Sequence, residues 1–210
     1  MIKCGRPQKG MEQLSRDRLL DAALRLFLEH GYGNLSMETI ARDAHVSMRT
    51  IYSQFGGKAG LFGALIRRSS DQFVDSLSTQ YPPKEALIAF SRQFLRYITR
   101  PDIVRIRAIL IGESPRFPDL AMQFYQQGPQ RTLDYLTKFF SEQQQLGYFS
   151  MIPSHFLAEQ FLSALRSERL QKLQLGLEKT PDEQEIDDWA KQATELFLNG
   201  CWLDRTNINR

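Results

Sequence analysis

The sequence predicts an all-α protein, and two observations support this prediction. Apolar residues recur at intervals of three and four along most of the 210 residues, which is the period of a helix face. Clusters of glycine, proline and serine fall between the periodic segments, where helices are expected to begin and end. No segment reads as a strand, so the fold class is helix packed on helix.

Three helices are expected within the first 60 residues. The first, capped by Ser15, presents one apolar face and ends at Gly31. The second begins at the cap Ser36, and the third covers residues 48–55 behind the cap Ser47. About three residues separate the second helix from the third, which is the spacing of a helix-turn-helix in which one helix projects from the surface.

The remaining helices are each bounded by proline or glycine. One helix is expected from Lys58 to about Ser78. Further helices are expected over residues 84–99, 102–112, 117–127, 129–146 and 154–177. The last helix has the clearest start signal, with Thr180 as its cap, Pro181 in its first turn and Glu183 at the capping-box position.

These elements suggest three parts: a basic arm over residues 1–15, a helix-turn-helix domain over 16–60, and a helical regulatory and dimerisation domain over 61–210. Residues 1–58 contain nine lysines and arginines against six acids, so the whole net charge of +3 lies in this first quarter. A polyanion is expected to bind there. The basic arm either reaches into a minor groove or is a disordered terminus.

Several functional classes lack support in the sequence. The two cysteines stand near opposite ends and the three histidines are scattered, so neither a disulfide nor a metal site is expected, and no cofactor. We expect no enzyme, because no nucleophile, base and acid arrangement or glycine-rich phosphate loop is recognisable. Neither a membrane span nor a secretory signal is recognisable, which places the protein in the cytoplasm.

Residues 16–62 closely resemble the DNA-binding domain of the TetR family of regulators. The match is carried by Ala22-Ala23, Phe27, Gly31-Tyr32, Ile40-Ala41, Val46-Ser47, Thr50-Ile51-Tyr52, Phe55 and Lys58. The resemblance implies a transcriptional regulator that binds double-stranded operator DNA and assigns Tyr52 and Lys58 to phosphate contacts. Their phenol and ammonium groups suit an oxygen-rich backbone.

The third helix is expected to enter the major groove, which is about 12 Å wide in B-DNA. Arg49 can form two hydrogen bonds to a guanine. Gln54 or Ser53 can hydrogen-bond to an adenine edge or to the backbone, and the sequence does not decide which of them does so. The start of the second helix is expected to offer amides to a phosphate. The predicted DNA-binding set is Ser36, Met37, Ser47, Met48, Arg49, Thr50, Tyr52, Ser53, Gln54 and Lys58.

The sequence departs from the family pattern at two places where backbone geometry matters. His45 stands where the family has glycine, at a turn position expected to need positive φ. Gly57 to Gly60 replaces the usual start of the fourth helix, and each helical glycine costs up to about 1 kcal/mol relative to alanine. We therefore expect this hinge to fray, and slow amide exchange at residues 58–61 would rule that out.

The segment from Ile109 to Phe161-Leu162 resembles the C-terminal domain of the AefR-like subgroup of this family. The resemblance implies a helical domain that dimerises and senses a small-molecule effector, whose identity it leaves open. Aromatic side chains at helical spacing are usually core residues, yet they are also the candidates for a ligand pocket. The candidate ligand contacts are Phe73, Phe90, Phe94, Tyr97, Arg105, Ile109, Phe124 and Tyr125, with Arg107 and Glu113 as further polar anchors.

The last two predicted helices carry more apolar surface than one buried face needs, so we expect them to form the interface of a homodimer, with simple core packing as the alternative. The expected interface residues are Phe161, Leu165, Trp189, Ala193, Leu196 and Phe197. Such a protein reads a palindromic operator and acts as a repressor that the effector releases. The alternatives are an activator or architectural factor, a small helical enzyme, and a protein-interaction module.

Overall fold

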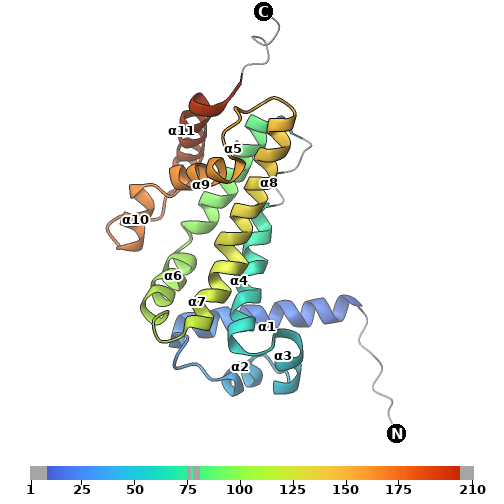
Figure 1. Ribbon diagram of the computed structural model, residues 1–210. Helices are drawn as coiled ribbons and strands as arrows, with labels where there is room; N and C mark the ends of the chain where they lie inside the picture. The colour runs from blue at the N-terminus through green and yellow to red at the C-terminus, as the bar shows by residue number, and fades with distance from the viewer. Residues whose placement is uncertain (1–8, 75–76, 78–80, 204–210) are drawn as a thin grey trace, which may run out of the picture. The chain divides into compact units, whose positions relative to one another are not determined.

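The computed structural model describes residues 9–74, 77 and 81–203 (Figure 1). Within these residues the secondary structure is helical, apart from an isolated bridge between Phe149 and Trp202, so the all-α prediction is confirmed. Over the same residues no helix has both the length and the apolar character needed to cross a bilayer.

The chain forms two compact units. Of the described residues, the first unit contains those up to Ile66 together with 109–124, and the second contains those in 67–108 together with those from Tyr125 to Leu203. The sequence predicts that the helix-turn-helix domain ends at residue 60 and that one helical domain covers 61–210. In the structure, however, residues 109–124 belong to the first unit. Residues far apart in sequence therefore build the first unit.

The first unit contains the three expected N-terminal helices. They are α1 (Lys9–His30), α2 (Met37–Asp43) and α3 (Met48–Phe55), joined by the start of α4 (Lys58–Val74), the end of α6 (Pro101–Glu113) and most of α7 (Pro118–Tyr125). The helix start expected at Ser15 is wrong, because α1 begins at Lys9 and Ser15 lies inside it. Residues 1–8 of the expected basic arm lie outside the described residues.

Aromatic rings fill the centre of the first unit. Phe27 of α1 stacks on Tyr32 with a centroid distance of 5.7 Å, and Phe62 of α4 meets Phe27 edge-on at 5.4 Å. Ile40 and Ile51 supply fully buried aliphatic side chains from α2 and α3. Burying an apolar side chain of this size stabilises a fold by about 1.5–3 kcal/mol, so this shared core fixes α3 against α1.

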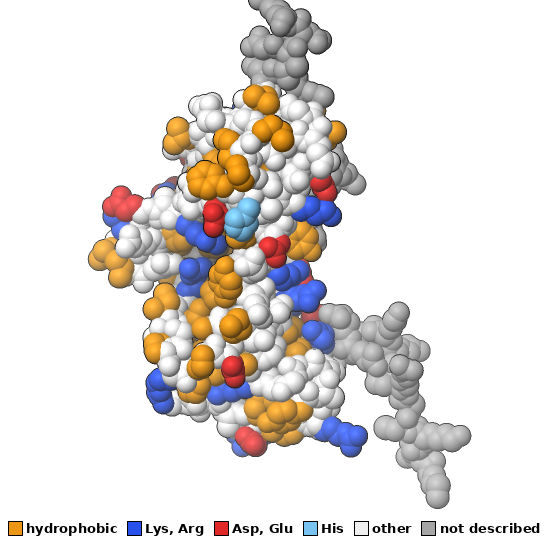
Figure 2. Space-filling model, viewed as in Figure 1, with side chains coloured by type: hydrophobic (Ala, Val, Ile, Leu, Met, Phe, Trp, Pro, Cys, Tyr) orange, Lys and Arg blue, Asp and Glu red, His pale blue; other side chains and the backbone are white. Residues whose placement is uncertain are grey.

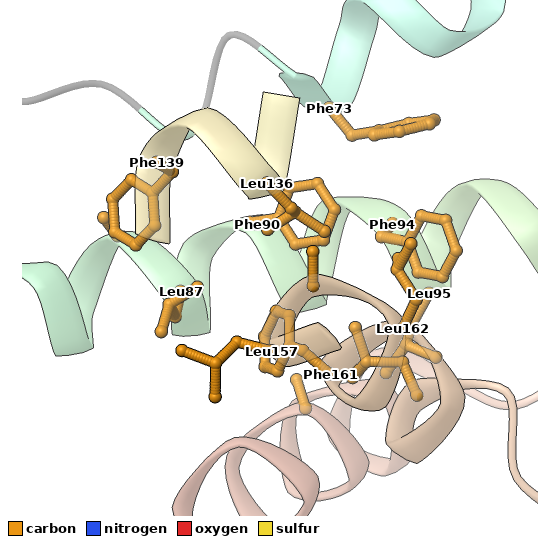
Figure 3. Close-up of a cluster of buried hydrophobic side chains, with 14 of the residues drawn as sticks. Phe73, Leu87, Phe90, Phe94, Leu95, Leu136, Phe139, Leu157, Phe161 and Leu162 are labelled. Atoms are coloured by element: carbon orange, nitrogen blue, oxygen red, sulfur yellow. The ribbon is translucent and has the colours of Figure 1, made fainter. Parts of the chain in front are cut away.

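The second unit is a helical bundle. Its main helices are α5 (Pro83–Ile98), α8 (Arg131–Gln145), α9 (Ser154–Leu165) and α11 (Glu183–Cys201), with the short α10 (Glu168–Gln174) after α9. α9 packs against both α8 and α11, and α11 also packs against α5. Figure 3 shows the core between these helices, where side chains from α5, α8 and α9 meet.

A five-residue π-helical turn, Gln126–Gln130, joins α7 to α8, whereas the sequence predicted separate helices there. Pro129 has no N–H to donate, and the wide turn accommodates that gap without ending the helix. Side chains satisfy the carbonyls in this turn: Thr132 Oγ1 donates to Gly128 O at 2.9 Å, and Ser70 Oγ donates to Gln127 O at 3.2 Å.

Two expected helix boundaries are wrong. The segment 154–177 is two helices, because the chain leaves helical geometry at Arg166 and a new helix begins after Ser167. The capping box of the last helix is present but lies two residues later than expected. Asp182 caps the helix, and its partner is Glu185, whose backbone N–H donates to Asp182 at 2.9 Å.

Apolar side chains also remain on the surface. On the face shown in Figure 2 they lie in separate patches among charged side chains. Leu196 on α11 is 76% exposed and Phe156 on α9 is 50% exposed. Single exposed apolar side chains are normal on a protein surface, so the dimer interface stays a prediction.

Candidate nucleic-acid interface

The sequence of α3 fixes both of its ends. Ser47 caps the helix as expected, because its hydroxyl oxygen accepts the Thr50 N–H at 3.0 Å. Gly56 ends the helix in the left-handed region, with φ of 74° and its N–H donating to Tyr52 O at 2.9 Å. Ile51 is fully buried and anchors one face of the helix.

The opposite face of α3 is polar and open. Arg49, Tyr52, Ser53 and Gln54 are exposed, and Tyr52 retains 52% of its accessible surface. Ser53 Oγ donates to Thr50 O at 3.0 Å, which leaves the lone pairs of its oxygen available to an outside donor. An eight-residue helix with one buried anchor and four polar side chains pointing outward can enter a groove.

Other members of the predicted set are less available. Met48 and Thr50 are half-buried, and the Thr50 hydroxyl lies 2.7 Å from that of Ser47. Ser36 caps α2 by accepting the Thr39 N–H at 3.1 Å. The side chain of Met37 belongs to the core with 8% exposure, so it cannot form a contact surface.

The turn between α2 and α3 has the geometry expected from the sequence. His45 has a φ of +53°, the positive value that the position was predicted to need. The Val46 N–H donates to Ala41 O at 3.0 Å and closes the turn onto α2. On the same side, Arg25 of α1 donates to Asp43 of α2 at 2.6 Å, and this ion pair raises the pKa of Arg25.

Lys58 lies at the start of α4, half-buried over the ring of Tyr32, with its Nζ 4.4 Å from the ring centroid. Burial lowers the pKa of Lys58, and the negative charge of Glu113 acts in the opposite direction. An ammonium held over an aromatic face is positioned before any partner arrives. Lys58 is therefore less mobile than a surface lysine.

Glu113 holds the loop beneath Lys58. Its carboxylate accepts the N–H of Tyr32 at 3.2 Å and the N–H of Gly33 at 2.6 Å. Phe117 adds a ring contact to Tyr32 at 5.2 Å. The sequence suggests Glu113 only as a candidate polar anchor for a ligand, and this structural role is not visible in it. No periodicity links it to Tyr32 some 80 residues earlier.

The predicted ligand contacts lie in different parts of the described chain. Phe73, Phe90 and Phe94 are at most 3% exposed and pack ring against ring in the core of the second unit, where Figure 3 shows them. Tyr97 packs beside Phe73 and Arg105 is exposed. Ile109 and Phe124 belong to the first unit, whereas Tyr125 lines a cavity of the second.

The predicted dimer contacts differ in how far their side chains are exposed. Phe161, Leu165 and Trp189 lie in the core of their own protomer with at most 9% exposure, which leaves them almost no surface for a partner. Ala193 and Phe197 are half-buried against that core. Leu196 is the member of the set that points into solvent.

Metal and thiol chemistry receive no support from the described residues. Over that part of the chain no three histidine, cysteine or acidic side chains form a group that could hold a metal ion. Burial raises the pKa of Cys201 to about 11, and its Sγ donates to Phe197 O at 3.3 Å. Such a thiol is protonated at neutral pH and unreactive. Cys4 lies outside the described residues.

Known proteins resemble both units. The family described as bacterial regulatory proteins, tetR family, matches residues 19–65, and the AefR-like transcriptional repressor C-terminal domain matches residues 85–200. The HTH-type transcriptional regulator BetI of Agrobacterium fabrum is 39% identical over 87 residues. That match covers 40% of this chain and 42% of BetI, less than half of the relative's length.

Two solved structures extend the likeness over most of the chain. The Flavonoid-responsive Regulator FrrA is 33% identical with a TM-score of 0.70, and the match covers 90% of this chain and 98% of FrrA. A TetR regulator from Agrobacterium tumefaciens has a TM-score of 0.69 at 22% identity, with 90% and 96% covered, and shares the fold. These relatives are transcriptional regulators and not enzymes. The chain therefore belongs to the TetR family of bacterial regulatory proteins.

Proposed function

We propose that this protein is a ligand-responsive repressor that binds a palindromic operator as a homodimer. The observation that carries the proposal is the geometry of α3, where Ile51 is fully buried while Arg49, Tyr52 and Gln54 are exposed on the other side. A helix built in this way suits the major groove, where arginine and glutamine can hydrogen-bond to base edges. Bacterial operators lie in the cytoplasm, which is where the protein is expected to act.

Two kinds of contact are expected at the operator. Arg49, Ser53 and Gln54 contact base edges and select the sequence, whereas Tyr52 and Lys58 contact phosphates and position the helix. Lys58 is held over Tyr32, so its contact point on the backbone is fixed relative to α3. Met37 is left out because its side chain is buried.

A palindrome requires two copies of α3 separated by about one turn of DNA, roughly 34 Å. We place the dimer surface on α9 and α11, where Phe156 and Leu196 are exposed. An effector bound in the second unit favours a dimer whose recognition helices have the wrong separation, and the operator is released. FrrA is described as flavonoid-responsive, and its likeness to this chain supports a response to a small organic molecule.

The test begins with selection of bound sequences from a random DNA pool by the purified full-length protein. We expect an inverted repeat with half-sites about one helical turn apart. Affinities for the selected site are then compared for wild type, Arg49→Ala, Tyr52→Phe and Lys58→Ala at several salt concentrations. The alanine change at Arg49 is expected to relax the sequence preference at one position and to cost about 1–3 kcal/mol.

The phosphate variants are expected to behave differently. Tyr52→Phe and Lys58→Ala should weaken binding to all sequences alike, and Lys58→Ala should reduce the slope of affinity against salt by about one. Lys138→Ala removes an exposed cation from α8 and serves as the control. Unchanged affinity in all three α3 and α4 variants, or a selected pool without any common sequence, would refute the proposal.

A further inference from the structure

The three arginines of α1 have different surroundings. Arg25 donates to Asp43 of α2 at 2.6 Å, so its charge is balanced within the protein. Arg18 donates to the carbonyl oxygen of Leu14, one turn earlier on the same helix, at 3.3 Å. Arg16 differs from both, because its guanidinium lies over an aromatic ring of another helix.

The ring under Arg16 belongs to Phe55, the last residue of α3. The central carbon of the guanidinium lies 4.8 Å from the ring centroid, and both residues are half-buried. A cation over an aromatic face is held there by its charge, and this contact does not use its N–H donors. Among the described residues, Arg16 forms no ion pair with a carboxylate and no hydrogen bond to a protein acceptor. Its guanidinium is therefore held at the end of α3 with its donors available.

Phe55 lies on the same side of α3 as Tyr52, because residues three apart on a helix are neighbours. Tyr52 in turn lies beside the turn that follows α3, where a Cβ added to Gly57 would stand 3.7 Å from Tyr52 Cε1. Lys58 follows this turn directly as the first residue of α4. Arg16, Tyr52 and Lys58 therefore lie around the C-terminal end of α3.

The chain around this end of α3 is free of acids. No aspartate or glutamate occurs between Asp43 and Asp71, a stretch that includes all of α3 and the first turns of α4. Asp17 follows Arg16 in α1, but adjacent residues of a helix do not face each other. An arginine held in such surroundings suits an anionic partner from outside the protein, and a DNA phosphate is the anion that an exposed α3 would meet.

We propose that Arg16 of α1 contacts a DNA phosphate and that the ring of Phe55 positions it for that contact. A guanidinium can donate two parallel hydrogen bonds to a phosphate, and holding it on the ring beforehand reduces the entropy lost on binding. With Tyr52 and Lys58, Arg16 fixes the end of α3 against the DNA backbone. The predicted DNA-binding set contains no residue of α1. The inference rests on the proposed function, because it adds a contact to the same DNA interface.

The experiment titrates the full-length protein with the selected operator duplex and with a duplex of random sequence, each at several salt concentrations. In Arg16→Gln the affinity for both duplexes is expected to fall about tenfold, because a hydrogen bond to a charged group is lost. The slope of log affinity against log salt should decrease by about one, since one phosphate fewer is neutralised. Arg16→Lys keeps the charge and should restore the slope.

Phe55→Leu tests the role of the ring, because it removes the cation–π contact and keeps the charge of Arg16. The cost of Arg16→Gln should be smaller in this background than in wild type, since the guanidinium is no longer held. Arg18→Gln is the matched control. Arg18 lies two residues along α1 and faces a different direction, and it lines a groove that also contains Asp21 and Asp43. This change should leave the affinity and the slope as in wild type.

Melting temperatures without DNA separate a phosphate contact from a purely structural role. A wild-type slope in Arg16→Gln overturns the inference, and a lowered melting temperature in the same variant would then show that the arginine only supports α3. An equal cost of Arg16→Gln with and without the ring of Phe55 would overturn the positioning role of that ring. If no common sequence is selected from the random pool, the proposed function fails, whereas binding to the random duplex still decides the inference.

Discussion

The residue that ties the most distant parts of the first unit together is Glu113. Its two carboxylate oxygens accept the N–H groups of Tyr32 and Gly33, and Gly31 lies so close that an added Cβ would stand 2.7 Å from Glu113 Oε1. Tyr32 in turn lies under the ammonium of Lys58. One carboxylate therefore positions the loop, the ring and the lysine that we assign to a DNA phosphate.

Replacement of Glu113 by alanine is expected to lower the free energy of unfolding by about 1–3 kcal/mol, because two backbone N–H groups lose their acceptor. Operator affinity should fall as well, since the support of Lys58 is loosened. Urea unfolding with an unchanged m-value measures the first effect, and DNA titration measures the second.

Glu113→Gln is the conservative comparison for this prediction. Its amide oxygen can still accept the Gly33 N–H, but its NH₂ group would face the Tyr32 N–H, so an intermediate loss is expected. If the alanine variant unfolds at the same urea concentration as wild type and binds DNA equally well, the carboxylate has no anchoring role.

His45 shows how far a single position could be predicted from the sequence. The position was expected to need positive φ because relatives have glycine there, and the structure gives +53°. A local backbone requirement can be inferred from local residues and a family pattern. The hydrogen bonds of Glu113 could not, because they depend on the long-range return of residues 109–124 to the first unit.

Among the elements, the junction of α3 and α4 contains a glycine whose surroundings leave no room for a side chain. A Cβ on Gly60 would stand 1.8 Å from the carbonyl oxygen of Phe55, a distance that no side chain can adopt. The sequence suggested that this glycine only weakens the start of α4. The structure adds that the close approach of α4 to the end of α3 requires it.

Gly60→Ala is expected to destabilise the protein by about 1–3 kcal/mol, because either Phe55 or the first turn of α4 must move. The shift acts directly on the last residue of the recognition helix, so operator affinity should fall in parallel. Thermal unfolding and DNA titration of the same preparation measure the two effects.

Gly112→Ala is the matched control, because nothing lies within 4 Å of a Cβ added there. In α6 this change should be neutral or stabilising by up to about 1 kcal/mol. Equal stability of Gly60→Ala and wild type would mean that the junction adjusts without cost. The fraying expected at residues 58–61 is a separate prediction, and the rate of amide exchange at these residues tests it.

Helix bounds were predicted well where residues close in sequence determine them, and poorly where packing between distant residues determines them. The caps Ser36 and Ser47 and the bounds of α3 are as expected, since serine caps act over three residues. The sequence did not predict that α7 continues into α8 through a π-helical turn at Pro129. That turn depends on hydrogen bonds from distant side chains, such as the one from Ser70 to the carbonyl of Gln127. Helical periodicity also could not tell core rings from pocket rings, and Phe90 proved fully buried.

For the whole molecule, the proposed function requires two copies of α3 on one DNA duplex. The second unit offers an exposed apolar side chain on α11, Leu196, next to positions that are buried in their own protomer. The sequence alone could not distinguish the exposed position from the buried ones, since Trp189 and Leu196 both belong to the apolar pattern of the same helix. The solvent-facing position is the one available to a partner.

Leu196→Glu is therefore expected to convert the dimer to a monomer, because the change places a charge in an apolar contact without a partner. A monomer engages one half-site at a time and loses the effective concentration of the second, so operator affinity should fall at least about a hundredfold. Analytical ultracentrifugation measures the mass. Leu177→Glu, at a position that is 71% exposed outside α9 and α11, should remain dimeric. A dimeric Leu196→Glu variant with wild-type operator affinity would move the interface away from this face of α11.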